Sequence, residues 1–358
     1  MSNKTPREEG FRMPAEWERH EATWLAWPHN PDDWPGKFQA IPWLYAEIVR
    51  LLARYERVHL LVQDEKEQRR ATSILERAHA NLDHVSFHLW ATDRVWTRDS
   101  GPIFIRNASG EVAVTNWRFN AWAKYPDWHL DDQIPGRAAE LLGVPQWQPT
   151  IDVDGERRRL VLEGGSIDTN GQGIMLTTEE CLLSEVQQRN PGVSREQLEQ
   201  AFRDYLGIDN VIWLGRGIAG DDTHGHVDDI TRFVGPTTIV TAVETDISDY
   251  NHEPLVENFE RLQAARTADG KQFTIVELPL PRPVVFRRQR LPASYANFYI
   301  ANGVVLVPTF HDPNDRIALG IIAQLFSDRE VIGIHAVDLV WGLGTLHCMT
   351  QQQPSRDL

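Results

Sequence analysis

A cysteine, a histidine and three carboxylates stand at or just before the start of apolar, strand-like runs in this chain. They are Asp99, Glu163, His226 with Asp228, and Cys348. Successive positions are roughly 60 residues apart, and the last interval is about twice as long. Repeated structural units produce such a regularity. Each unit would then deliver its polar side chain to one shared centre.

These residue types suit chemistry on a planar cation. A thiolate is a strong nucleophile, and a histidine can protonate a leaving group and then deprotonate water. Carboxylates can hold a guanidinium ion by paired hydrogen bonds. Attack of sulfur on the guanidinium carbon would expel ammonia and leave a covalent thiouronium, which water would hydrolyse. Since this reaction needs neither a metal nor an organic cofactor, we expect none.

The intervening segments predict the elements that would position these residues. Hairpins are indicated where two apolar runs flank a turn, and a helical pattern follows each of them. The clearest helix has a capping box from Ser194 to Gln197 and ends at Gly207. A short apolar strand completes each unit, as at 211–214 and 331–334. The predicted hairpins pair 103–105 with 112–114, 161–162 with 174–176, 230–234 with 238–243, and 295–300 with 304–307.

Four such units are visible along the chain. A fifth would combine the strand at Cys348 with residues 22–27. The predicted architecture is a closed ring of α/β units with the site on its axis. Residues 1–358 would form one domain, because no Ser/Gly-rich linker or low-complexity tract interrupts the series.

Composition narrows the class of protein. The formal net charge of −15 disfavours a nucleic-acid partner and favours a small cationic substrate. Polar residues through Gly10 and short apolar runs predict neither a secretory signal nor a membrane partner. The presence of two cysteines indicates a reducing, cytoplasmic compartment, and we expect Cys181 to be a buried packing residue. The composition leaves open whether the chain forms a homo-oligomer.

Longer motifs surround the candidate residues. They are WTRDSGP (96–102), LEGGS (162–166), GDDTHGHVDD (220–229) and HCMTQQQP (347–354), accompanied by MPAEW (13–17), TWLAWP (23–28) and FNAW (119–122). Together they resemble the agmatine deiminase family, which includes the bacterial peptidylarginine-deiminase type, in the guanidino-group modifying superfamily. The resemblance covers nearly the whole chain. It implies a five-bladed, pseudo-symmetric α/β propeller, which agrees with the ring inferred from the spacing.

The resemblance also implies roles for the candidate residues. Cys348 would be the nucleophile and His226 the general acid and base. Asp99, Glu163 and Asp228 would hold the guanidinium, Asp99 and Asp228 most directly and Glu163 in a pairing that also involves His226. The implied reaction converts agmatine and water to N-carbamoylputrescine and ammonia, a step of putrescine and hence polyamine biosynthesis.

Agmatine fits an acidic pocket because it carries two positive charges and no carboxylate. Arginine would bring a carboxylate that needs a cation. Arg98 is a poor candidate for that cation, because adjacent side chains on an extended strand point to opposite faces. Trp96 would either cover the alkyl chain of the substrate or belong to the core.

Three positions depart from the family pattern, namely His224, Leu343 and Thr345. Relatives that act on agmatine often have Gly-Gly-Gly-Asn-Ile-His-Cys up to the nucleophile, and an acidic residue in place of His224. The reacting groups themselves are unchanged, so these departures bear on the choice of substrate. The tract 120–128 looks like a divergent substrate-side loop.

Other interpretations remain open at this point. The deiminase could act on free or peptidyl arginine. A zinc hydrolase could use His224, His226 and Asp228, although this would leave Glu163 and Cys348 without a role. A binding protein could keep the ring and lack catalysis. Glu163 could accept backbone hydrogen bonds in a turn, and Asp99 could pair with Arg98 or cap a turn.

Overall fold

Five separate small sheets built on one strand pattern carry the fold. The computed structural model describes residues 4–357. In each sheet an antiparallel pair of strands is extended by a parallel strand. Within the described residues no sheet closes on itself, and the fold is mixed α/β. In their order across each sheet, the strands are β20 (Gln351–Pro354), β1 (His20–Ala26), β2 (Arg57–Val62) and β3 (Val85–Leu89); β4 (Ile103–Arg106), β5 (Val112–Thr115) and β6 (Gln146–Trp147); β9 (Asp168–Thr169), β10 (Ile174–Thr178) and β11 (Asn210–Leu214); β12 (Thr231–Gly235), β13 (Thr238–Val243) and β14 (Thr274–Pro279); and β17 (Tyr299–Ile300), β18 (Val304–Thr309) and β19 (Glu330–His335).

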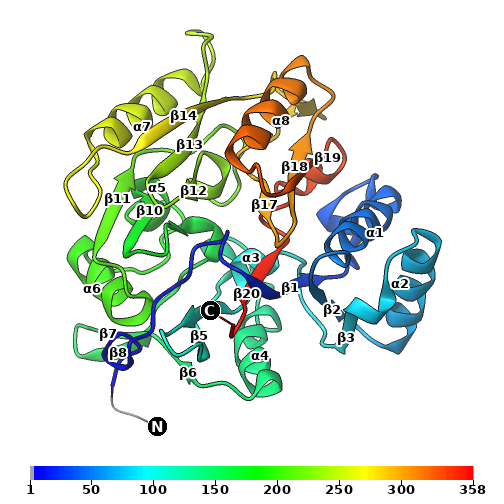
Figure 1. Ribbon diagram of the computed structural model, residues 1–358, viewed down its shortest axis with the longest axis horizontal. Coiled ribbons are helices and arrows are strands. Elements are labelled where there is room, and N and C mark those ends of the chain that lie inside the picture. The colour runs from blue at the N-terminus through cyan, green and yellow to red at the C-terminus, as the bar shows by residue number, and fades with distance from the viewer. Residues whose placement is uncertain (1–3, 358) are drawn as a thin grey trace.

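The longer helices lie around the outside of these sheets, while β1, β20 and α3 lie near the middle of the view (Figure 1). Two isolated hairpins add β7 (Thr150–Val153) with β8 (Glu156–Arg159), and β15 (Val285–Phe286) with β16 (Gln289–Arg290). The helices are α1 (Ile41–Leu52), α2 (Glu65–Arg77), α3 (Thr97–Ser100), α4 (Ile134–Leu142), α5 (Glu179–Leu182), α6 (Arg195–Leu206), α7 (His252–Ala264) and α8 (Pro313–Leu325). No helix in residues 4–357 combines the length and the apolar character that crossing a bilayer requires.

Helix α6 forms as its sequence predicts. The Ser194 side chain accepts from the backbone N–H of Gln197, whose own side chain returns the bond, and Gly207 ends the helix with φ 71°. This φ lies in the left-handed region that glycine adopts without steric cost. The buried face includes Leu198 and Phe202, which pack into the core.

Most of the predicted hairpins are confirmed. Strands β4 and β5, β12 and β13, and β17 and β18 pair antiparallel, although β17 begins only at Tyr299. The predicted pairing of 161–162 with 174–176 is wrong, because β10 pairs with β9 instead. Val161 instead forms an isolated bridge with Arg118, whose carbonyl oxygen accepts from the backbone N–H of Leu162. A 3₁₀ turn at Gly164–Ser166 separates these residues from β9.

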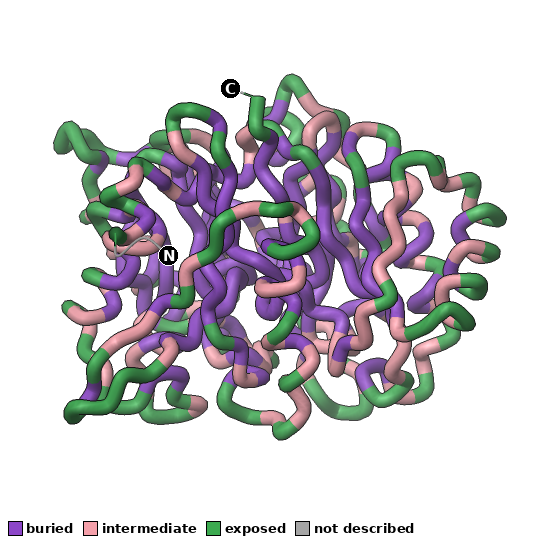
Figure 2. The backbone as a smooth tube through the Cα atoms, turned by 90° about the horizontal axis from the view of Figure 1, so that it is seen from below, coloured by how far each residue is buried: buried purple, intermediate pink, exposed green. Residues whose placement is uncertain are grey.

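The two ends of the chain meet as predicted for the fifth unit. Strand β20 follows Cys348 and pairs antiparallel with β1, so that Thr23 faces Gln352. The buried backbone runs through the interior, and the exposed segments lie at the periphery (Figure 2). The segment that carries Cys348 is therefore anchored in the middle of the molecule.

A buried arginine connects three of the sheets. Arg232 on β12 is fully buried and donates to Asp168 on β9 at 2.7 Å and to Glu16 at 2.8 Å. It also donates to the carbonyl oxygens of Ala296 and Phe298, in the segment that leads into β17. An ion pair of this kind is costly to break, because the remaining charge stays buried without a partner.

We therefore expect Arg232→Met to destabilise the fold strongly. The substitution leaves the carboxylates of Glu16 and Asp168 without their shared cation, and the free energy of unfolding should fall by about 3–5 kcal/mol. Urea unfolding measures this change. Arg69→Met is the matched control, because Arg69 is exposed and pairs with Glu65 at 3.5 Å on the surface of α2. Equal effects of the two substitutions would contradict the role of Arg232.

Candidate active site

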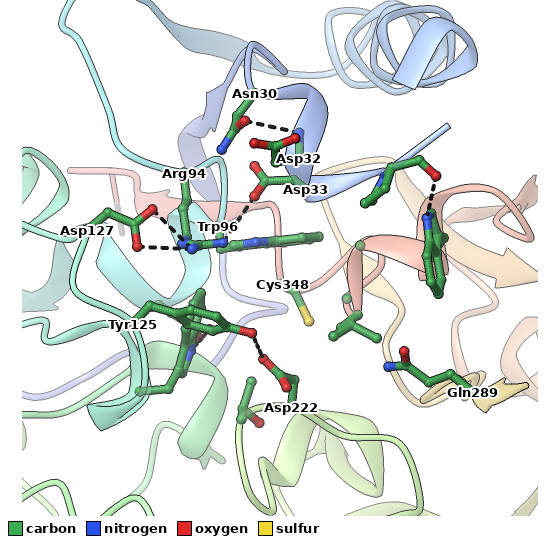
Figure 3. Close-up of a pocket in the computed structure, with 18 residues that line it drawn as sticks. Asn30, Asp32, Asp33, Arg94, Trp96, Tyr125, Asp127, Asp222, Gln289 and Cys348 are labelled. Carbon is green, nitrogen blue, oxygen red and sulfur yellow. Dashed lines mark hydrogen bonds and ion pairs between the residues drawn. The ribbon is translucent and has the colours of Figure 1, made fainter. Parts of the chain in front are cut away.

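A cavity of about 400 Å³ opens onto Cys348 (Figure 3). Trp96, Asp99 and Trp122 line it near the sulfur, and Leu343 and Gly344 lie on the segment that leads to the cysteine. Further out the lining is acidic. The remaining residues are Asn30, Asp32, Asp33, Pro35, Arg94, Tyr125, Asp127, Asp222, Thr223, Gln289, Trp341 and Gly342.

Asp99 lies on the single helical turn α3, and the expected extended strand at this position is wrong. The hydroxyl of Thr97 donates to the carbonyl oxygens of Trp24 and Met349 at 3.0 and 2.7 Å, which fixes the turn between β1 and β20. Arg98 nevertheless supplies no cation to the cavity, as expected. Its side chain donates to Gln352 and Glu16 and does not line the cavity.

The carboxylate of Asp99 is held by two neutral donors. Its Oδ1 accepts from the backbone N–H of Gly165 at 3.0 Å, and its Oδ2 accepts from Trp122 Nε1 at 2.9 Å. A Cβ at position 165 would lie 2.7 Å from Asp99 Oδ1, so the close approach requires glycine. Trp122 lies in a turn where residues 121–123 all have positive φ, and such strain is found where a side chain must be placed for function.

His226 lies among all three predicted carboxylates. Its Nδ1 is 3.8 Å from Asp99 Oδ1 and 4.0 Å from Asp228 Oδ1, and its Nε2 is 3.6 Å from Glu163 Oε2. The four side chains are buried, and neither ring nitrogen of His226 has a hydrogen-bond partner in residues 4–357. Glu163 Oε2 and Asp228 Oδ1 are likewise unpartnered. Unpartnered buried acceptors at such short range can receive the N–H groups of a cation.

Glu163 is fixed by an arginine that the sequence did not single out. Arg189 Nε donates to Glu163 Oε1 at 3.0 Å, and neither side chain is exposed. Burial alone would raise the pKa of Glu163, but the Arg189 guanidinium and His226 outweigh it and lower the pKa to about 2. Glu163 is therefore ionised at every physiological pH.

Asp228 is fixed from the opposite side by His347. His347 Nδ1 lies 2.7 Å from Asp228 Oδ2, and His347 Nε2 lies 2.7 Å from Glu16 Oε2. Glu16 in turn accepts from Arg232, from Arg98 and from the backbone N–H of Ile300. One oxygen of Asp228 is thereby occupied, and the other is left facing His226.

Asp99 and His226 have strongly shifted pKa values. Burial, with the charges of Asp228 and Glu163, raises the pKa of Asp99 to about 6. Burial alone would lower the pKa of His226, but the Asp99 carboxylate, Cys181 and Glu163 raise it well above its ordinary value. At neutral pH His226 is therefore an imidazolium that can donate a proton.

Cys348 lies on the loop before β20 and is 6% exposed. Its Sγ lies 3.8 Å from Asp228 Oδ2 and accepts a hydrogen bond from Asn297 Nδ2 at 3.1 Å. Burial and the carboxylates of Asp228, Asp229 and Asp99 raise the pKa of the thiol well above its ordinary value. A cation bound between these carboxylates and the sulfur would lower that pKa again.

The structure thus brings together all of the predicted site residues. Asp99, Glu163, His226 and Asp228 form one buried cluster, and Cys348 adjoins it through Asp228. Trp96 lines the cavity beside them (Figure 3). Cys181 is buried in the core as expected, but it also lies beside His226, which the sequence did not indicate.

The alternative zinc set of His224, His226 and Asp228 is not among the groups of possible metal ligands in residues 4–357. His224 Nε2 contacts Ser184 Oγ at 3.1 Å, and its Nδ1 is 4.0 Å from Glu180. In the described part of the chain, two groups of three place possible ligand atoms within 4.8 Å of one another. These are Glu163 with Cys181 and His226, and Asp228 with Asp229 and Cys348.

The outer cavity contains an arginine held by two aspartates. Arg94 NH1 donates to Asp33 at 3.0 Å, and Arg94 NH2 donates to Asp127 at 3.0 Å (Figure 3). The second oxygen of Asp33 is buried without a partner, and burial raises the pKa of this carboxyl to about 6. The Arg94 guanidinium lies 4.3 Å from the centre of the Tyr125 ring, and the Tyr125 hydroxyl donates to Asp222 at 2.7 Å.

Several of these residues were missed by the sequence analysis. Glu16 stood in the MPAEW motif and His347 next to the nucleophile, but their contact joins positions 331 residues apart. Arg189, Asn297 and Arg94 had no such signal. Of the noted departures, Leu343 lines the cavity with a left-handed φ of 68°, and the Thr345 hydroxyl donates to Asn297 Oδ1.

Comparisons with known proteins agree with one another. The family model of Porphyromonas-type peptidyl-arginine deiminase matches residues 12–354. The agmatine deiminase of Ectopseudomonas mendocina is 35% identical over 376 residues, covering 98% of this chain and 97% of that protein. The agmatine deiminase structure of Enterococcus faecalis has a TM-score of 0.89 at 31% identity, with 99% of both chains covered. An agmatine deiminase from C. jejuni with substrate bound has a TM-score of 0.82 at 28% identity, with 96% of both chains covered.

The pKa of His226 leads to a prediction about stability. The folded pKa lies above the ordinary value of 6.5, so the imidazolium stabilises the fold fully below that pH, and this contribution is lost as the pH rises through the folded pKa. The difference in unfolding free energy between the wild type and His226→Asn should therefore fall as the pH rises above about 6.5. Urea unfolding across this range measures it.

His335→Asn is the control for this measurement, because His335 is an exposed residue at the end of β19. It should leave the pH dependence of the wild type unchanged. A His226→Asn difference that grows with rising pH would contradict the assigned charge.

Proposed function

The chain belongs to the Porphyromonas-type peptidyl-arginine deiminase family, and we propose that it hydrolyses agmatine to N-carbamoylputrescine and ammonia. The observation that carries this proposal is the cluster of buried carboxylates around His226, next to Cys348 at the inner end of an acidic cavity. The relatives named as agmatine deiminases cover nearly the whole chain, which supports the same reaction. The product is a precursor of putrescine, so the reaction belongs to polyamine biosynthesis.

The buried carboxylates support a mode of substrate binding. Asp99, which lines the cavity, and Asp228 Oδ1 accept N–H groups of the guanidinium, and Glu163, whose Oε2 lies 3.6 Å from His226 Nε2, adds a third negative charge. A guanidinium presents its donors in a rigid fork, which matches carboxylates held in fixed positions. Trp96 covers the alkyl chain from the cavity wall. The substrate cation neutralises the charges that raise the pKa of Cys348, and so promotes the thiolate.

Cys348 then acts as the nucleophile. Its sulfur forms a bond to the guanidinium carbon, and the electron pair of the C=N bond moves to nitrogen. The His226 imidazolium protonates one amino group, which leaves as ammonia with the electrons of the C–N bond. A covalent thiouronium remains, and its positive charge stays paired with the carboxylates.

Water completes the reaction with His226 as the base. The neutral imidazole accepts one proton of the water while its oxygen attacks the carbon. The C–S bond breaks and its electrons return to sulfur, which regenerates the thiolate. The product is the ureido compound, His226 is again protonated, and the second proton of the water passes to solvent, where ammonia takes it up.

The cavity favours a substrate with two positive charges. Five aspartates and one arginine are the charged residues of its lining within residues 4–357. Arg94, the cation that could receive the carboxylate of arginine, already pairs with Asp33 and Asp127. Asp33 keeps one oxygen without a partner, and this oxygen is available to the distal ammonium of agmatine.

We also propose how the rest of the chain is organised. The five sheets share one strand pattern, and this supports the interpretation that they are the blades of a pseudo-symmetric five-bladed propeller. The series spans residues 4–357 without a linker, which supports one domain over 1–358; residues 1–3 and 358 lie outside the described part. The two cysteines are both free, in accord with a cytoplasmic enzyme.

Cys348→Ser should reduce turnover by at least about a thousandfold, because a hydroxyl is a much weaker nucleophile without a strong base. Steady-state ammonia release measures the loss. A haloacetamidine should alkylate Cys348 and leave the buried Cys181 unmodified, as peptide mass spectrometry would show. Loss of activity with Cys181 modified and Cys348 intact would falsify the assignment.

The choice of substrate is tested by comparing kcat/KM for agmatine, free arginine, a peptidyl arginine and butylguanidine in one buffer. Agmatine should exceed arginine by about a thousandfold or more, because burying an unpaired carboxylate is costly. Butylguanidine has the same chain without the ammonium, so its deficit reports the acidic outer cavity. A ratio near one, or one that favours arginine or the peptide, would move the substrate to the arginine-directed branch.

A further inference from the structure

Asn297 lies directly beside the sulfur of Cys348, in the segment that leads into β17. The side chain is fully buried. Its Nδ2 is 3.1 Å from Cys348 Sγ and 3.0 Å from Asp229 Oδ1. The two hydrogens of the amide are therefore divided between the sulfur and a carboxylate.

The orientation of this amide is fixed by its oxygen. Asn297 Oδ1 accepts from the backbone N–H of His347 at 3.0 Å and from the Thr345 hydroxyl at 2.6 Å. A rotated amide would place its NH₂ group against the backbone N–H of His347 and its oxygen against Asp229. Both contacts are unfavourable, so the NH₂ group must face the sulfur. The backbone N–H of Cys348 is a third donor to this oxygen, at 3.5 Å, and all three donors belong to the segment that ends at Cys348.

The sulfur has few other sources of stabilisation. The titratable groups around it are Asp99 on α3, His226, Asp228 and Asp229 in the turn before β12, Tyr45 on α1, and His347, which contacts the Asp228 oxygen next to the sulfur. The three aspartates oppose a negative charge on sulfur, and hydrogen bonding from the Thr345 backbone favours it. Asn297 is the one side chain in residues 4–357 that donates a hydrogen bond to Sγ.

We propose that Asn297 is a further catalytic residue, whose amide N–H stabilises the Cys348 thiolate that attacks the substrate. This rests on the nucleophilic role of Cys348 in the proposed function. A hydrogen bond to an ionised acceptor is roughly twice as strong as a bond to a neutral one. The amide therefore favours the thiolate over the thiol, in a site whose carboxylates favour the thiol.

Lowering the pKa of a thiol also makes its thiolate less nucleophilic, so the net effect must be weighed. Below the pKa, each unit of decrease gives about tenfold more thiolate and costs only about threefold in intrinsic reactivity, for a Brønsted coefficient near 0.45. The net gain is about threefold per unit. Stabilisation of the thiolate by Asn297 therefore accelerates attack.

The test is the pH dependence of Cys348 alkylation by iodoacetamide, with the site of modification located by mass spectrometry. Asn297→Asp has the same shape and keeps an acceptor for His347 and Thr345, but it removes the donor to sulfur and adds a charge. The double variant Asp229→Asn/Asn297→Asp exchanges the two side chains, so that the amide is at position 229 and donates to the carboxylate at position 297. Its net charge equals that of the wild type. The sulfur still lacks its donor in the double variant.

We expect the midpoint of alkylation to move to higher pH by about one unit or more in both variants. Asp229→Asn alone keeps the donor and removes a carboxylate, so its midpoint should move to lower pH. A double variant that titrates like the wild type would show that Asn297 acts only through Asp229, and would overturn the proposal.

Asn297→Ala covers the case in which the double variant does not fold. It removes the same donor without adding a charge, and an unchanged alkylation profile in this variant would also overturn the proposal. Thermal unfolding of each variant shows whether the fold is kept. Because alkylation of the thiol needs no substrate, the result stands whether or not agmatine is turned over, so the two proposals fail independently.

Discussion

The carboxylate of Glu16 binds four segments of the chain at one buried point. It accepts from Arg98 on α3, from Arg232 on β12 and from the backbone N–H of Ile300 on β17, and it lies 2.7 Å from His347. Two arginines lower the pKa of Glu16 against the effect of burial, so the charge persists. The distances between the reacting groups depend on this one ion cluster, since α3 carries Asp99 and His347 precedes Cys348.

Like charges are concentrated at the centre of the site at a cost in stability. Two carboxylates of similar chemistry have very different pKa values there, about 2 for Glu163 beside Arg189 and about 6 for Asp99 between two neutral donors. His226 is the cation that makes this arrangement tolerable in the resting protein. Buried charge that is only partly compensated is typical of functional sites, where a ligand completes the balance.

The sequence predicted the parts of the site whose signals are local. Strand and turn patterns located the hairpins of β4 with β5 and β12 with β13, and the residue types of Cys348, His226 and the three carboxylates indicated their chemistry. The failures have a common cause. Contacts with distant residues decide the conformations that the local pattern predicts wrongly. Arg118 binds residues 161–162 in place of β10, and Trp24 and Met349 fix the helical turn that carries Asp99.

The residues that support the site were harder to find for the same reason. Arg189 and Asn297 have ordinary local sequences, and only the fold brings them to Glu163 and Cys348. A buried amide that orients a thiol is indistinguishable in sequence from one that caps a turn. Supporting contacts of this kind require the assembled structure, because their partners lie 26 and 51 residues away in the chain.

Because β20 pairs with β1, the active site is completed only late in folding. The hydrogen bond between Trp24 and Gln353 joins positions 329 residues apart, and contacts so distant in sequence form slowly because the intervening loop must close first. A chain whose ends have not yet met lacks β20 in its first sheet and has its cysteine outside the site, and Asp228 lacks its contact with His347. Enzymatic activity during refolding therefore reports the final docking of the termini and lags behind the recovery of secondary structure.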